Sequence, residues 1–200
     1  MKHTTKKSVF VLLIAALSFA SCSKDKTETV TPETPATVTV KNDIDASAGI
    51  VYYNLTTGTV VDAADAATTK WDVAFTGTNN MPVITANKTS GSAQIVASAF
   101  DDVKEAPADG YQAAGTALAD FQTWATYTAM TAPMHAVLAK TDATIVIKTP
   151  DGKYAKLQVI NFYSGHPDTT TPEFANLQTR PKFGFYSIRY AIQTSGSRKF

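Results

Sequence analysis

Cys22 is the residue whose type and position predict the clearest chemistry in this sequence. It is the only cysteine of the 200-residue chain, and it follows a lysine-rich start, an apolar run over residues 9–17 and the small residues Ala20 and Ser21. A basic start, a short apolar run and small residues before a cleavage point make up a secretory signal. A cysteine directly after that point indicates a bacterial lipoprotein, acylated on the sulfur and on the new amino group. Two or more acyl chains form a stable membrane anchor.

The chain is predicted to divide into three parts. Residues 1–21 are the lipoprotein signal peptide. Residues 22–36 are the lipidated cysteine and a flexible spacer, because Ser, Thr, Lys, Asp, Glu and Pro leave little to bury. Residues 37–200 are long enough for one domain with its own core, and with no further cysteine that core depends on burial alone. We therefore expect a membrane-tethered protein that works outside the cytoplasm; the alternative is plain secretion with an unmodified thiol.

The charge and the motifs of the predicted mature chain exclude two classes of function. Residues 1–21 hold three of the 18 basic residues and no acidic ones, which leaves 15 basic against 17 acidic residues. Binding to nucleic acid needs clustered positive charge, which this balance does not supply. The sequence also lacks a Gly-x-Ser-x-Gly elbow, a His-Glu-x-x-His motif and a glycine-rich phosphate loop. We expect neither a nucleic-acid-binding protein nor an enzyme.

Short runs of β-branched and aromatic residues, separated by turn residues, predict a chain made mostly of strands. Such a pattern, with few helical segments, indicates an all-β fold: a β-rich, antiparallel, sandwich-like domain with little helix. One short helix is expected over residues 117–124. The expected strands cover residues 37–40, 50–55, 59–61, 71–75, 83–85, 94–96, 144–148, 153–163 and 183–192.

The clearest element is a hairpin whose strands cover residues 144–148 and 153–163, joined through a Thr-Pro-Asp-Gly turn. Both of its strands carry apolar residues on both faces. This pattern is typical of a strand inside a sheet, so we expect Leu157 and Val159 to be buried. Strict alternation places Phe162 on the opposite face from Leu157.

Three segments together resemble one protein family. They are Trp71 to Phe75 (Trp-Asp-Val-Ala-Phe), the hairpin end Asp151 to Leu157, and the closing strand Phe185 to Tyr190. In this order they resemble the HmuY family, the haem-binding outer-membrane lipoproteins of Bacteroidetes, over most of residues 40–195. The resemblance implies a lipid-anchored domain at the surface of the outer membrane that binds haem for iron acquisition. It also implies transfer of the haem to a TonB-dependent outer-membrane receptor.

The resemblance also implies where haem iron would be held. In this family the iron lies between two axial side chains, two histidines or two methionines, one of which comes shortly before the hairpin. The corresponding stretch contains Met130, Met134 and His135, and thioether sulfur and imidazole nitrogen are both haem ligands. Among these candidates Met134 is expected to matter most, because a thioether binds without losing a proton. The segment between Tyr111 and the hairpin is shorter than in well-recognised members, so no second axial ligand is assigned.

The aromatic and methionine candidates each have a ligand-binding and a packing interpretation. Trp124 and Tyr127 are expected either to wall an apolar pocket for a flat macrocycle or to pack in the core. Met130 and Met134 are either ligands or gap-filling side chains. His166 lies in a Gly-His-Pro loop for which the family suggests no ligand. For the whole protein, the alternative is a surface lipoprotein that binds no haem and acts as a structural or recognition module.

Overall fold

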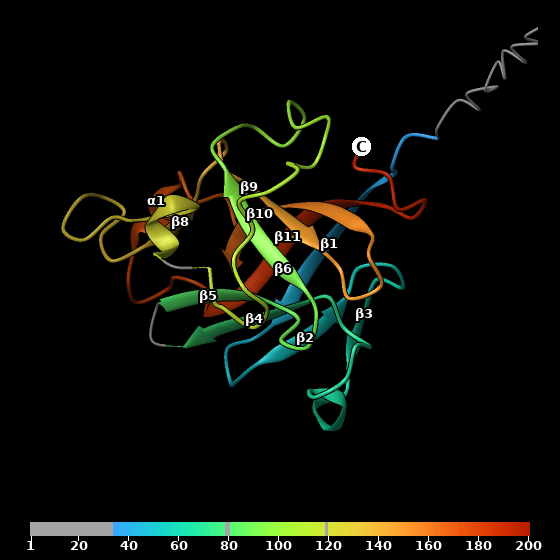
Figure 1. The fold of residues 1–200 in the computed structure, drawn as a ribbon. Coiled ribbons are helices and arrows are strands. Elements are labelled where there is room, and N and C mark those ends of the chain that lie inside the picture. The colour runs from blue at the N-terminus through green and yellow to red at the C-terminus, as the bar shows by residue number, and fades with distance from the viewer. Residues whose placement is uncertain (1–33, 79–80, 119) are drawn as a thin grey trace, which may run out of the picture. The chain divides into compact units, whose positions relative to one another are not determined.

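Strands dominate the structure, a computed structural model that describes residues 34–78, 81–118 and 120–200 (Figure 1). The predicted signal peptide, Cys22 and the spacer up to residue 33 lie outside the described residues. Within these three ranges, no helix is long and apolar enough to cross a membrane.

The described ranges contain strands β1 to β11, two short 3-10 helices and one short α-helix. The strands are β1 (Val38–Asp45), β2 (Val51–Asn54), β3 (Thr59–Val61), β4 (Val73–Thr78), β5 (Met81–Ala86), β6 (Ser92–Val96), β7 (Ala125–Tyr127), β8 (Val137–Ala139), β9 (Thr144–Lys148), β10 (Tyr154–Tyr163) and β11 (Phe183–Gln193). The helical elements are η1 (Ala63–Asp65), η2 (Phe121–Thr123) and α1 (Pro172–Ala175). The predicted β-rich fold with little helix is confirmed.

The strands form two main antiparallel sheets and one separate ribbon. A five-stranded sheet has the order β1-β11-β10-β9-β6, a four-stranded sheet has the order β3-β2-β4-β5, and β7 pairs with β8. Figure 1 shows β10 between β9 and β11, in the middle of the larger sheet. Leu157 and Val159 on β10 are 0% and 5% exposed, as the hairpin pattern predicts.

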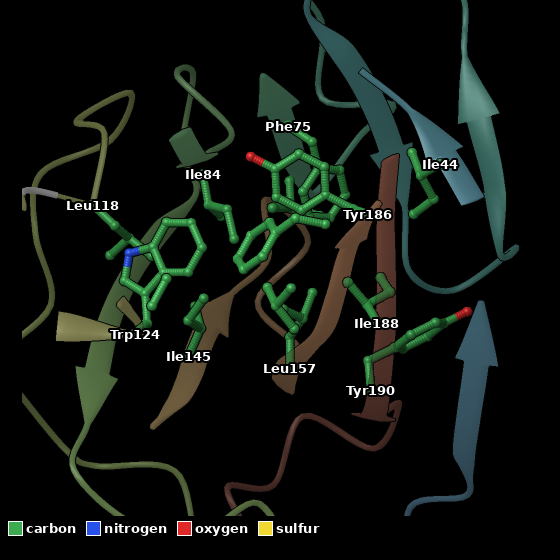
Figure 2. Close-up of a cluster of buried hydrophobic side chains, with 14 of the residues drawn as sticks. Ile44, Phe75, Ile84, Leu118, Trp124, Ile145, Leu157, Tyr186, Ile188 and Tyr190 are labelled. Carbon is green, nitrogen blue, oxygen red and sulfur yellow. The ribbon is translucent and has the colours of Figure 1, made fainter. Parts of the chain in front are cut away.

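One hydrophobic core joins the two main sheets (Figure 2). Phe75 of β4 packs against Tyr186 of β11, with 4.9 Å between the ring centroids. This pair of aromatic rings is a direct contact between the two sheets. Leu157 and Ile188 extend this core along β10 and β11. Each aromatic pair of this kind adds about 0.5–1.5 kcal/mol beyond the area that it buries. The core thus fixes how the smaller sheet lies against the larger one.

Two glycines let the sheets approach at the backbone. A Cβ atom built on Gly77 of β4 would lie 2.5 Å from the Cα of Gly184, and Gly184 itself has a φ of +100°, which L side chains rarely adopt. Ala46 links the two strands, because its N–H donates to Gly184 O at 2.8 Å and its carbonyl accepts from Gly77 N at 3.0 Å. Side chains at these glycines would force β4 and β11 apart.

The predicted helix over residues 117–124 is wrong. The N–H of Leu118 donates to Ile84 O at 2.8 Å, so this part of the segment runs along β5. Asp120 has a left-handed φ of 49°, and its carboxylate accepts from the N–H of Gln122. A residue with positive φ cannot continue a right-handed helix, so η2 is the one helical turn among the described residues of this segment.

The expected alternation along β10 also fails near its end. The register with β11 shifts between Val159 and Asn161, which is a β-bulge. Beyond the bulge the faces exchange, and Phe162, at 0% exposure, joins Leu157 in the core. Because the bulge re-aims the end of β10, it also determines where Tyr163 lies beside the ribbon of β7 and β8.

Candidate ligand site

The ribbon of β7 and β8, neither of which the sequence predicted, carries a loop over residues 128–136. Hydrogen bonds close this loop on itself: Thr128 N–H donates to Ala136 O at 2.9 Å, and His135 N–H donates to Ala129 O at 2.7 Å. The Thr128 hydroxyl also accepts from the N–H of Ala136 at 2.9 Å. These bonds hold the loop in a defined conformation instead of leaving its backbone groups to water.

This loop brings together the three ligand candidates predicted from the sequence. Met130 is 74% exposed and Met134 is 40% exposed, and His135 is also exposed. These exposures exclude packing inside the core for the two methionines and leave packing at its rim as the alternative to a ligand role. The loop presents two thioethers and one imidazole at the surface, all of which can bind a soft or borderline metal.

Tyr127 orients the imidazole of His135. Its hydroxyl oxygen lies 2.7 Å from Nδ1 of His135, and the two ring centroids are 6.1 Å apart. When Nδ1 carries the proton and donates it to this oxygen, the lone pair of a neutral imidazole is on Nε2. In the described part of the chain Nε2 has no hydrogen-bond partner. An imidazole held through one nitrogen with the other open is the arrangement that metal-binding histidines use.

A shallow hollow of about 210 Å³ lies beside His135. One of its lining residues is the buried Tyr163, whose hydroxyl accepts from Val137 N–H at 2.9 Å and whose ring meets that of Phe174 edge-on, with 4.7 Å between the centroids. Burial raises the pKa of Tyr163, so its hydroxyl stays neutral, and the nearby guanidinium of Arg180 partly opposes this shift. The residues around the hollow are His135, Tyr163, Leu177, Arg180, Pro181 and Phe183.

The two predicted pocket residues lie in different places. Trp124 is 2% exposed and packs on Phe162 at 5.8 Å between ring centroids, inside the core shown in Figure 2. It does not line the hollow, so the core-packing interpretation matches its position. Tyr127 is 39% exposed and contacts His135. Of the pair, Tyr127 alone belongs to the candidate site.

His166 lies in a different environment from His135. Its Nδ1 is 3.5 Å from Oδ2 of Asp43, whose other carboxylate oxygen accepts from Gly165 N–H at 2.8 Å. This carboxylate fastens the turn after β10 to β1. Among the residues with described positions, no group of three His, Cys, Asp or Glu side chains could hold a bare metal ion.

The structure is thus a two-sheet β domain that carries two thioethers and one imidazole on one surface loop. The profile of the HmuY protein family matches residues 46–175. The chain belongs to the HmuY family, as the three sequence segments predict. Membership places it among binding proteins and not among enzymes.

The chain is similar to several solved structures, and the one with a TM-score above 0.5 supports this fold. An apo HmuY analogue from Tannerella forsythia matches with a TM-score of 0.54 at 18% identity, covering 82% of this chain and 99% of that one. Apo PinO from Porphyromonas gingivitis matches with a TM-score of 0.49 at 14% identity, over 80% and 98% of the two chains. A protein from Bacteroides vulgatus ATCC 8482, provisionally described as an HmuY-like haem-binding protein, gives 0.44 at 14% identity, over 78% and 91%. No curated protein matches the chain.

The side chains on the loop fit haem in their chemistry. Histidine nitrogen and methionine sulfur are ordinary axial ligands of haem iron, and the loop offers both. The hollow is smaller than the roughly 300–1,000 Å³ of most small-molecule pockets. A macrocycle at this site would therefore be only partly enclosed.

Proposed function

We propose that this protein is a lipid-anchored outer-membrane protein that captures haem at the cell surface and passes it to a TonB-dependent receptor. Membership of the HmuY family supports haem as the ligand. The observation that carries the proposal is the hydrogen bond of 2.7 Å between Tyr127 and His135, because it prepares one imidazole for metal binding. The anchor would be Cys22, which the structure does not describe.

Within this proposal His135 supplies one axial nitrogen to the iron, through Nε2. Its ring is held by Tyr127, whereas the side chains of Met130 and Met134 are 74% and 40% exposed. A ligand whose ring is already oriented loses less conformational entropy when it binds. We therefore rank His135 above Met134, the reverse of the order expected from the sequence. Haem, when bound, contributes the iron centre that makes its capture useful for iron acquisition.

The direct test is a titration of the mature chain with hemin, using Cys22→Ser protein so that no acyl chain binds hemin by itself. A saturable Soret band at one hemin per protein supports the proposal. His135→Ala should shift that band and weaken binding at least tenfold, whereas Met134→Ala should have a smaller effect. His166→Ala is the matched control, since its imidazole contacts Asp43 and not the loop.

The second candidate function is a surface module that binds no haem. The limited hollow of about 210 Å³ and the exposed methionines favour it, since both also suit a protein contact. If hemin produces no saturable Soret band with wild type, and the spectra of His135→Ala are the same as those of wild type, this alternative is supported and haem capture is rejected.

A further inference from the structure

Arg180 is the cationic side chain of the hollow beside His135, and the structure holds it firmly. Its Nε donates to Phe174 O at 2.8 Å, and its Nη2 lies 3.5 Å from Ala175 O. The guanidinium also lies over the ring of Phe174, 4.8 Å from its centroid. These carbonyls end the short helix α1, where backbone acceptors lack partners within the helix. The side chain is therefore pre-positioned at the rim of the hollow.

The charge of Arg180 has no carboxylate partner in the described ranges. The chain has three arginines, and the other two are paired. Arg189 lies 3.1 Å from Asp101, and Arg198 lies 2.6 Å from Glu105. The contacts of Arg180 are to backbone carbonyls, to the ring of Phe174 and to the hydroxyl of Tyr163, which is neutral, so they orient the guanidinium without neutralising it. Planar guanidinium groups suit carboxylates because two N–H groups can donate in parallel.

The hollow thus combines two different recognition groups. One wall carries His135, an imidazole suited to a metal, and another carries Arg180, an unpaired cation suited to an acid group. Apolar contact comes from Leu177, Pro181 and Phe183. A ligand that uses all three features is flat and apolar and carries both a metal and a carboxylate.

We infer that Arg180 is the carboxylate-recognition residue of this site and that it pairs with an acid group of a bound porphyrin. The inference rests on the proposed haem-binding function and makes it more specific. It states that the site selects porphyrins with free carboxylates over their esters. Charge-assisted hydrogen bonds are among the stronger polar contacts, so loss of the charge should be measurable.

The test compares hemin with hemin dimethyl ester, whose acid groups carry no charge, on the mature Cys22→Ser protein. Wild type should bind hemin about tenfold or more tightly than the ester. Arg180→Gln should reduce hemin affinity by a similar factor and leave ester affinity within about twofold. Arg180→Lys should keep most of the discrimination, because it keeps the charge. Lys182→Gln is the matched control: it removes an equal charge two residues away, and Lys182 does not line the hollow.

The possible failures can be told apart. If Arg180→Gln weakens the binding of hemin and of its ester equally, Arg180 only supports the loop, and the inference is overturned while haem binding stands. The same holds if wild type binds both porphyrins equally. If wild type binds neither, the proposed function fails and the inference falls with it. A melting curve for each variant, measured without ligand, identifies any loss of affinity that comes from unfolding.

Discussion

The hydroxyl of Tyr127 and Nδ1 of His135 lie 2.7 Å apart across the two ends of a nine-residue loop, residues 128–136. Tyr127 is the last residue of β7, and His135 comes two residues before β8, so the contact depends on the pairing of these short strands. The same loop places His135 at a φ of 53°, in the left-handed region that few residues other than glycine adopt.

Tyr127→Phe should therefore weaken hemin binding without unfolding the protein. The substitution keeps the ring and removes only the oxygen that fixes the imidazole. Loss of a group that orients a metal ligand typically costs 10–100-fold in metal affinity, so we expect about tenfold. Hemin titration measures the effect, and a melting curve checks the fold. Unchanged affinity would mean that His135 is not held for the metal by this bond.

Leu157→Ala should destabilise the domain by about 2–5 kcal/mol, because it leaves a cavity in the centre of the larger sheet. Ile160→Ala is the matched control on the same strand, because Ile160 is 46% exposed and Leu157 is fully buried. The control should change the free energy of unfolding by less than about 0.5 kcal/mol. Urea unfolding followed by tryptophan fluorescence measures both. Equal effects would show that β10 is not central in solution.

Gly77→Ala should destabilise the protein by about 1–3 kcal/mol through overpacking. The added methyl would lie 2.5 Å from the backbone of Gly184, so one strand must move. Gly49→Ala provides the comparison, since a Cβ there meets nothing within 4 Å. We expect that variant to be as stable as wild type or slightly more so. Two variants of equal stability would contradict the close approach of β4 and β11.

Asp72 should make stability depend on pH. Burial raises its pKa from 3.8 to about 6, although a hydrogen bond from Leu55 N–H at 2.7 Å opposes the shift. Since the folded pKa lies above the unfolded one, this carboxyl favours folding in acid. Its contribution is fully present below about pH 3.8 and is lost as the pH rises through about 6. The loss is up to about 3 kcal/mol.

Asp72→Asn removes this titration and keeps an oxygen that can accept from Leu55. The stability of the variant relative to wild type should therefore increase by up to about 3 kcal/mol between pH 4 and pH 8. Comparing the two proteins by urea unfolding across this range cancels the titration of all other groups. A difference in stability that does not change with pH would contradict the raised pKa of Asp72.

Cys22→Ser should release the protein from the membrane, because no thiol remains to receive the lipid. Cell fractionation followed by a high-salt wash distinguishes lipid anchoring from electrostatic adsorption. A variant that stays in the washed membrane fraction, with normal processing, would show that residues 1–22 are not a lipoprotein signal. The wild-type chain, fractionated in parallel, is the control.

The sequence pattern predicted β9, β10 and β11 of the larger sheet well because these strands are rich in buried apolar residues, whereas β1, predicted only over residues 37–40, is mostly exposed. Strand β9 begins and ends where the alternation indicated, and β10 differs by one residue at its start. The strand expected from Trp71 begins instead at Val73. Trp71 packs outside the main core, with its ring 4.8 Å from that of Tyr52. Alternation alone does not distinguish a strand residue from one that is buried just before the strand.

The candidate site was harder to predict because its parts are local and irregular. Strands β7 and β8 have three residues each, which is too short for a hydrophobic period. The resemblance to the HmuY family pointed to Met130, Met134 and His135 as ligand candidates, but it did not indicate the hydroxyl of Tyr127 as a partner of His135. The start of helix α1 has a sequence signal, because Thr171 is a capping residue and Pro172 follows it in the first turn. That signal could have predicted a short helix from Pro172, and thus that Arg180 follows shortly after the end of a helix.

The pairing of β1 with β11 determines when the larger sheet can be completed. Val38, at the start of the domain, lies opposite Ala191, near the end of the chain, and the intervening strands of that sheet lie on the other side of β11 (Figure 1). A chain that emerges with its N-terminus first must therefore keep β1 unpaired until β11 follows. Such a non-local closure slows folding. For the lipoprotein proposed above this delay would be useful, because a chain that folds late can still pass through a translocation channel and acquires its stable structure only after crossing.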